Sequence, residues 1–419
     1  MTPTTVQIIG TLFFALAVIH TFSTRFFGHL ASTRPNHAGL WHLLGEVETV
    51  FGFWAIILIV SMGFIVGIDE AVEYLDTRNY TEPMFIFAIM VVAASKPVMQ
   101  FASALVRTSA RALPLPEPVA MYLTILTAVP LLGSLITEPA AMTLAAMMLR
   151  ERYYRKGMSR KLMYATIGTL FVNISIGGTL TNFAAPPVLM VAQTWGWDSL
   201  YMFSHFGWKA AIAVLTNGGA VVWIFRHELR QVSEEEAATA QQDVPPVMVG
   251  IHLFLLFLIV GFAHHPPVFL GVFLLFMGLA TAYPLYQERL ILREGLLVAF
   301  FLAGLIILGG LQAWWLQPLL SGMDATTTFF GVTGLTAFTD NAALTYLASL
   351  VDGLSEEIKY AVVAGAVTGG GLTVIANAPN PAGISILRGH FNEGIVNPLG
   401  LLVAALPPTL VATLAFRLL

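Results

Sequence analysis

Long apolar stretches separated by short polar segments fill most of the chain. A helix needs about 20 apolar residues to cross a bilayer. Stretches of roughly that length lie near 5–24, 43–67, 84–106, 161–193, 208–225, 248–263, 267–286, 295–313, 360–387 and 396–416. The pattern predicts an all-α polytopic membrane protein. No Lys or Arg precedes the first stretch, so we expect a retained helix rather than a signal peptide.

Two further apolar stretches, 118–149 and 318–351, are too long for one crossing and are interrupted in the middle. The interruption is TEPAAMT, starting at Thr137, in the first stretch and TDNAALT, starting at Thr339, in the second. A hairpin that enters and leaves the membrane on one side explains both. Irregular backbone at that depth is tolerated only where it is buried in protein or lines a cavity. We therefore predict two re-entrant hairpins with these heptads at their tips.

The acids of the heptads, Glu138 and Asp340, have two interpretations. An acid before a first helical turn is a good cap, and Pro139 suits that turn, so we expect both acids to cap a helix. Yet Ser, Thr or Asn could cap without a charge, and an ionisable group deep in a membrane costs roughly 2.5 kcal/mol or more. Two close carboxylates can hold either a proton or a metal cation. We predict that both acids also bind ions.

The basic residues favour one orientation. Most of the 20 Lys and Arg residues are cytoplasmic if the N-terminus lies outside, as the positive-inside rule requires. These are Arg25, Arg34, Arg107, Arg111, Arg150, Arg152, Arg155, Lys156, Arg160, Lys161, Arg226, Arg230, Arg289, Arg293 and Arg388. Arginines flank the first hairpin only, so the hairpins enter from opposite faces. We expect two inverted-topology repeats in a multi-pass protein of the bacterial inner (plasma) membrane, with both termini outside.

Each hairpin is followed by an apolar stretch that glycines and prolines interrupt. These residues break a helix and free backbone carbonyl and amide groups. The first break offers side-chain oxygens at Asn173, Thr179, Thr181 and Asn182, and the second at Thr368, Thr373, Asn377 and Asn380. Paired interrupted segments in corresponding positions point to a transport site, where unwound backbone replaces the water of a cation. We predict two broken transmembrane helices beside the hairpin tips.

Composition supports this class of protein. The chain is 57% hydrophobic and 11% charged, whereas soluble domains carry about 25% charged residues. It has no cysteine, which excludes disulfides and thiolate chemistry. No H-E-x-x-H, Walker A or dinucleotide motif is present. We expect a transporter rather than an enzyme, with no catalytic residues, no cofactor and no nucleic-acid partner.

Three other ionisable residues keep alternative interpretations. Lys96 lies within an apolar span and is either a counter-ion for a carboxylate or a structural residue. Glu46 and Glu48 lie near the start of the second stretch, where an interfacial position is the simpler explanation.

These features resemble the ion transporter superfamily, which includes sodium-coupled anion symporters, arsenite permeases and Na⁺/H⁺ antiporters. GGTLT (177–181) with the prolines at 186 and 187, and the FTDN tip (338–341), look most like the NhaD-type and related putative Na⁺/H⁺ antiporter branch. The symporter branch carries Ser-Asn-Thr at its tips, and the acids here depart from that pattern. Repulsion by these acids argues against a di- or tricarboxylate substrate.

The resemblance also implies an organisation of the chain. Family members pair a dimerising scaffold with a transport domain that moves in an elevator fashion. Here the scaffold corresponds to 1–112 and 248–317, and the transport domain to 113–226 and 318–419. Residues 227–247 form a cytoplasmic linker. A homodimer in the lipid bilayer follows by the same resemblance.

We therefore predict a secondary active sodium (or lithium)/proton antiporter. Glu138 and Asp340 exchange protons for Na⁺, which Asn341 also binds, and Thr137, Thr339 and the oxygens of the two breaks add neutral ligands. A cation-coupled organic or inorganic anion transporter of the same fold is the alternative, with Lys96 as its cationic contact. An intramembrane hydrolase with two carboxylates is a second alternative, but Asp340 lacks a G-x-G-D-like element.

Overall fold

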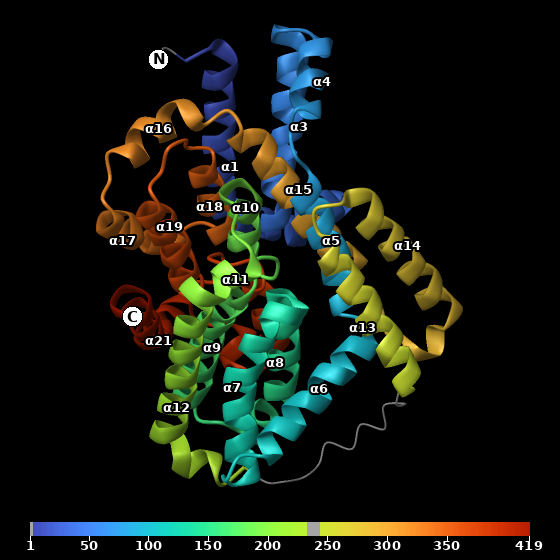
Figure 1. Cartoon of the computed structure of the whole chain (residues 1–419), viewed down its shortest axis with the longest axis vertical. Helices are drawn as coiled ribbons and strands as arrows, with labels where there is room; N and C mark the ends of the chain where they lie inside the picture. The colour runs from blue at the N-terminus through green and yellow to red at the C-terminus, as the bar shows by residue number, and fades with distance from the viewer. Residues whose placement is uncertain (1–2, 233–243) are drawn as a thin grey trace.

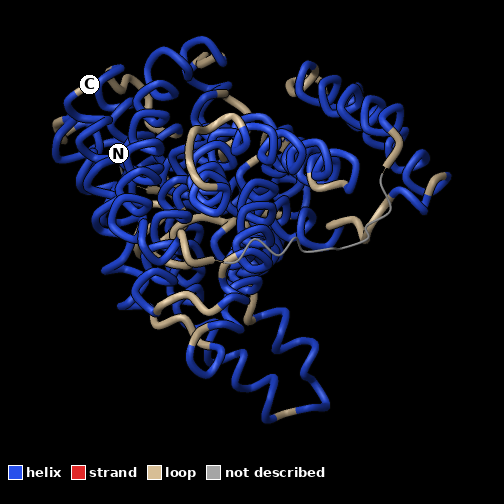
Figure 2. The backbone as a smooth tube through the Cα atoms, turned by 90° about the horizontal axis from the view of Figure 1, so that it is seen from below, coloured by secondary structure: helices blue, strands red, loops and turns tan. Residues whose placement is uncertain are grey.

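The computed structural model describes residues 3–232 and 244–419, which form helices and loops with no strand (Figures 1 and 2). In chain order the elements are α1 (Thr5–Thr33), η1 (Pro35–His37), α2 (Ala38–Leu44), α3 (Val47–Ile65), α4 (Ile68–Asp76), α5 (Thr81–Ala93), α6 (Lys96–Arg111), α7 (Glu117–Ile136), α8 (Glu138–Arg152), η2 (Tyr154–Lys156), α9 (Arg160–Gly177), η3 (Gly178–Leu180), α10 (Pro186–Trp195), α11 (Ser199–Met202), η4 (Phe203–Gly207), α12 (Trp208–Leu229), α13 (Pro246–Gly261), α14 (Pro266–Ala282), η5 (Pro284–Tyr286), α15 (Leu292–Gly309), α16 (Ala313–Ser321), α17 (Ala325–Thr336), α18 (Asn341–Ser349), α19 (Glu356–Gly369), α20 (Asn380–Leu387), η6 (Arg388–His390), η7 (Asn392–Gly394) and α21 (Pro398–Leu418).

Within the described residues, seven helices are long and apolar enough to cross a membrane. An eighth span is possible from α5 and α6 together, but these helices meet at an angle of 66°. Pro97 lies in the first turn of α6 and cannot continue the hydrogen-bond ladder of α5. The predicted span 84–106 is therefore bent in its middle, and Lys96 is the first residue after the bend. The class of polytopic helical membrane protein is confirmed.

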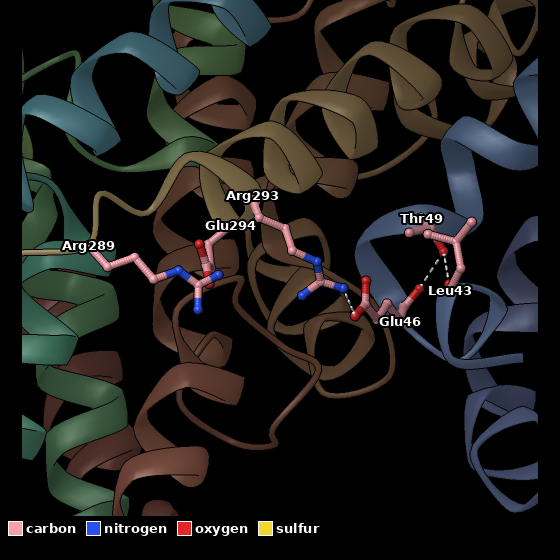
Figure 3. A network of polar contacts seen from close by, with 6 residues as sticks. All are labelled: Leu43, Glu46, Thr49, Arg289, Arg293 and Glu294. Atoms are coloured by element: carbon pink, nitrogen blue, oxygen red, sulfur yellow. Dashed lines mark hydrogen bonds and ion pairs between the residues drawn. The ribbon is translucent and has the colours of Figure 1, made fainter. Parts of the chain in front are cut away.

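Close backbone contact joins α3 to α15. A Cβ added to Gly304 would collide with the backbone at Phe51 and Gly52, so only glycine allows this approach. Small residues commonly permit such packing between membrane helices. At the start of both helices, Arg293 pairs with Glu46, while the Thr49 hydroxyl donates to the carbonyls of Leu43 (2.5 Å) and Glu46 (2.9 Å) (Figure 3).

In each of the two predicted hairpin segments, two helices meet at the heptad. Helices α7 and α8 pack together, and the Arg152–Glu117 ion pair (2.8 Å) closes their base. The second hairpin consists of α17, with 12 residues, and α18, with 9. At about 1.5 Å per residue these arms are roughly 18 and 14 Å long, shorter than the hydrocarbon core of about 30 Å. The second hairpin therefore cannot cross a bilayer, whereas α7 alone has the length of a span.

Both predicted helix breaks are also present. Helix α9 ends at Gly177 and the chain resumes as α10 at Pro186, and α19 ends at Gly369 before α20 begins at Asn380. After each break the chain packs against the hairpin of the other half: α10 contacts α18, and α20 contacts α8. The hairpin tips and the breaks therefore gather in one region.

Some boundaries differ from the sequence prediction. Helix α12 continues to Leu229 and α13 begins at Pro246, so the connection is shorter at both ends than the predicted 227–247 linker. Residues 233–243 of that linker lie outside the described residues. Helix α16 continues to Ser321, past the predicted scaffold boundary at 317.

The contact between α3 and α15 can be tested with Gly304→Ala. The new methyl group must push the two backbones apart, and such overpacking costs roughly 1–3 kcal/mol. We expect a lower midpoint of thermal unfolding in detergent, measured by the loss of the monodisperse peak in fluorescence-detected size-exclusion chromatography. Gly250→Ala in α13 is the control, because no atom lies within 4 Å of its added Cβ. Equal midpoints for the two variants would contradict the packing argument.

Candidate functional site

Both hairpin tips reach the helix breaks through their backbone. The Glu138 N–H donates to the Ala184 carbonyl (3.5 Å) in the first break. The Asn341 N–H donates to the Ala376 carbonyl (3.1 Å) in the second. Each tip thus binds the break of its own half.

The two halves repeat the same contacts between hairpin and break. The Thr181 hydroxyl donates to the Ser134 carbonyl (2.7 Å), and the Thr373 hydroxyl donates to the Ala337 carbonyl (2.9 Å). Close approaches follow the same spacing: Gly177 to Pro130 and Gly369 to Thr333, and Gly178 to Glu138 and Gly370 to Asn341. The contacts therefore match Glu138 with Asn341, whereas the heptads align Glu138 with Asp340. The structural correspondence is shifted by one residue.

Glu138 is the first residue of α8, and its side chain is fully buried, with 0% exposed. Its Oε2 atom accepts a hydrogen bond from Asn377 Nδ2 at 2.8 Å. Its Oε1 atom has no hydrogen-bond partner among the described residues. A buried carboxylate oxygen without a partner costs considerable free energy, so this atom points to a ligand.

Asp340 has a different place. It is the N-cap of α18, and its Oδ1 atom accepts from the Ala342 N–H at 2.8 Å. The capping interpretation is therefore confirmed for Asp340. It is wrong for Glu138, because Thr137 occupies the N-cap of α8 and makes no capping bond through its side chain.

Six buried side chains at the tips and the second break carry an oxygen atom without a hydrogen-bond partner among the described residues. We call them the tip cluster: Thr137, Glu138, Asn341, Thr368, Asn377 and Asn380. Each unpaired buried polar atom costs about 1–3 kcal/mol. Unpaired buried oxygens of this kind are the ligands with which a protein can replace the water of a cation.

Other predicted ligands are engaged in structural bonds. Asn173 donates to the Leu126 carbonyl (2.8 Å) and accepts from Asn217 (2.8 Å). Thr179 donates to the Ile176 carbonyl (2.7 Å), and Asn182 donates to the Trp197 carbonyl (3.1 Å). With Thr181 and Thr373, these side chains hold the breaks in place and lie outside the tip cluster. Thr339 is half-buried at the second tip.

The comparison with known proteins follows this geometry. Residues 5–419 match the family described as "Putative Na+/H+ antiporter". The chain belongs to this family. A comparison with curated proteins gives no match. Membership indicates cation/proton antiport in general and a transporter rather than an enzyme.

The other ionisable residues singled out in the sequence make no hydrogen bond to the tip cluster among the described residues. Lys96 is half-buried at the bend between α5 and α6, and no Lys or Arg among the described residues donates a hydrogen bond to the cluster. Glu46 is paired with Arg293, and Glu48 lies in the first turn of α3. The described residues contain no group of three His, Asp or Glu side chains suited to a metal ion.

Sequence reasoning missed two serines that support the antiporter site. Ser134 donates to the Gly177 carbonyl (2.7 Å) and accepts from the Leu180 N–H (3.0 Å), so it satisfies groups that the first break frees. Ser175 donates to the Val367 carbonyl (2.8 Å) and thereby connects the two broken helices. Ser134 lies one turn before Glu138, and this spacing was the available signal.

The close approach of Gly178 to Glu138 provides a way to test whether the tip cluster binds sodium. A Cβ on Gly178 would lie 2.6 Å from Glu138 Oε1, so Gly178→Ala must displace the carboxylate. We expect sodium to stabilise this variant against heat at concentrations at least tenfold higher than for the wild type, a difference of about 1.4 kcal/mol. Gly219→Ala in α12, where the added Cβ has no neighbour within 4 Å, is the control. The same sodium dependence in both variants would show that the Glu138 carboxylate does not bind sodium.

Proposed function

We propose that the chain is a secondary active antiporter that exchanges sodium or lithium for protons by alternating access, with Glu138 as the exchanging group. The observation that supports this most strongly is the fully buried Glu138 carboxylate, which has one oxygen bound to Asn377 and the other without a partner among the described residues. The neutral oxygens of the tip cluster also support the proposal, because they can replace the water of a monovalent cation.

Competition between a proton and a cation for the Glu138 carboxylate explains how the exchange becomes obligatory. A proton or a cation neutralises the carboxylate, whereas an empty charged site at membrane depth is costly. Only the two loaded forms therefore pass readily between the two sides. Release of a proton on one side and capture of sodium at the same carboxylate follow from this competition.

Asp340 has a supporting role in this proposal. Its charge acts on Glu138 across the site, so the two acids remain electrostatically linked. The Asp340 carboxylate accepts the Ala342 N–H and so caps the start of α18. We propose that Asp340 fixes the second tip, and that Asn341, the next residue, presents its amide oxygen to the cation.

The wider architecture is also a proposal. Repeated tip-to-break contacts support two repeats of the same unit, and the basic residues of the sequence favour opposite orientations for them. We propose that α7–α12 and α17–α21 move as a transport body against a dimeric scaffold of the other helices. The bacterial inner membrane, with both termini outside, remains the expected location.

The exchange can be tested with Glu138→Gln in proteoliposomes with an entrapped pH dye. The amide has nearly the shape of the carboxyl group but cannot release a proton. We expect sodium-driven proton movement to fall to the level of empty liposomes. Glu117→Gln, at the exposed base of the same hairpin, is the matched control and is expected to keep the exchange. Exchange by Glu138→Gln at the rate of the control would refute the proposal.

Asp340→Asn tests the supporting role. Asn is as good an N-cap as Asp, with a cost of at most a few tenths of a kcal/mol. We expect exchange within about threefold of the wild type in the same assay, whereas Asp340→Leu removes the cap and is expected to unfold at a lower temperature. Loss of all exchange in a stable Asp340→Asn protein would instead make Asp340 a second exchanging carboxylate.

A further inference from the structure

The place of Asn341 decides how much charge the site can carry. Asn341 makes the contacts in the second half that Glu138 makes in the first: its backbone binds the break, and its side chain lies against the second glycine pair. A Cβ on Gly370 would lie 2.9 Å from Asn341 Nδ2, as one on Gly178 would lie 2.6 Å from Glu138 Oε1. A neutral amide thus stands where the other half has a carboxylate.

The side chain of Asn341 makes no structural hydrogen bond among the described residues. Its side chain is 0% exposed, and neither its oxygen nor its nitrogen has a partner among the described residues. A fully buried amide with both ends unpaired is rare, because each end costs free energy until a ligand satisfies it. This position therefore belongs to the site, and its lack of charge has a consequence for binding.

Glu138 is the only acid among the six residues of the tip cluster. The nearby Asp340 accepts the Ala342 N–H, which favours its ionised form, so we take its charge to be the same whichever ligand Glu138 holds. The cluster therefore has one negative charge when Glu138 is ionised. One proton or one monovalent cation reduces that charge to zero. The two loaded forms then have the same charge, so one full exchange cycle moves no net charge and the membrane potential does no net work on it.

Resting on the function proposed above, we infer that Asn341 limits the site to one charge, so that the exchange is one monovalent cation for one proton and is electroneutral. A second carboxylate at residue 341 would instead favour a divalent cation or a second proton.

The null point of the exchange tests this inference directly. Wild-type protein is reconstituted with potassium and valinomycin to clamp the potential, and the proton gradient that stops net flux is measured against a fixed sodium gradient. We expect a roughly tenfold sodium gradient to be balanced by a roughly tenfold proton gradient, both at zero potential and at roughly −100 mV. Movement of one net charge would shift the balance about 50-fold over that range.

These outcomes separate the inference from the proposed function. A null point that moves with the potential overturns one-for-one exchange while leaving antiport intact. The absence of any sodium-driven proton flux refutes the antiporter proposal itself. The measurement uses wild-type protein, so it does not depend on the folding of a variant.

Asn341→Asp tests the part played by this residue. With a second carboxylate in the cluster, we expect calcium to inhibit sodium-driven flux at concentrations at least tenfold lower than in the wild type. Asn341→Ser is the neutral control: whatever its rate of flux, its null point is expected to stay independent of potential and its calcium sensitivity to stay below that of Asn341→Asp. Unchanged calcium sensitivity in a folded Asn341→Asp protein would show that this position does not set the charge of the site.

Discussion

The burial of one carboxylate, Glu138, is the constraint on which the rest of the site depends. An ionisable group at membrane depth is expensive, and an unpaired buried oxygen adds to that cost. Asn377 offsets part of it by donating one hydrogen bond from the other half of the chain. The hairpin that carries Glu138 and the break that carries Asn377 must therefore both stay in place, and neither half can form the site alone.

The close approaches around this acid explain several residue choices. Gly178 and Gly370 lie so near the tips that a side chain at either position would strike Glu138 or Asn341. Thr137 has a φ of 72°, the only non-glycine residue with positive φ in the described chain. That conformation is strained for a β-branched residue, at about 1–3 kcal/mol, and such strain persists only where surrounding structure maintains it. Here it turns the chain so that Glu138 starts α8 and faces inward.

The hairpins and the two breaks could be predicted from the sequence because they follow from patterns with a direct physical cause. Apolar length, and glycine or proline within an apolar run, indicate spans and breaks without knowledge of the tertiary structure. The bonding role of each polar residue could not be predicted in this way. Asn173 and Asn377 are both fully or almost fully buried beside a break, but only the contacts show that Asn173 binds backbone while Asn377 binds Glu138.

The one-residue shift between the heptads likewise could not be predicted from the residue pattern. Aligning the acids by identity equates Glu138 with Asp340, yet a side chain's direction depends on where its helix begins. Helix α8 begins at Glu138, whereas α18 begins one residue after Asp340. Asp340 therefore becomes a cap, and Asn341 takes the inward position. A short motif shared by two segments can preserve the residue types while the helix start assigns them different functions.

The two breaks differ in the hydrogen bonding of their polar side chains. Polar side chains of the first break bind backbone within its own half, at Ile176, Ser134 and Trp197. Those of the second break leave the oxygens of Thr368, Asn377 and Asn380 unpaired. One half thus supplies the buried acid of the tip cluster, and the other supplies most of its neutral oxygens. Because α20 packs against α8 and α10 against α18, any motion that keeps the site intact must carry both halves together.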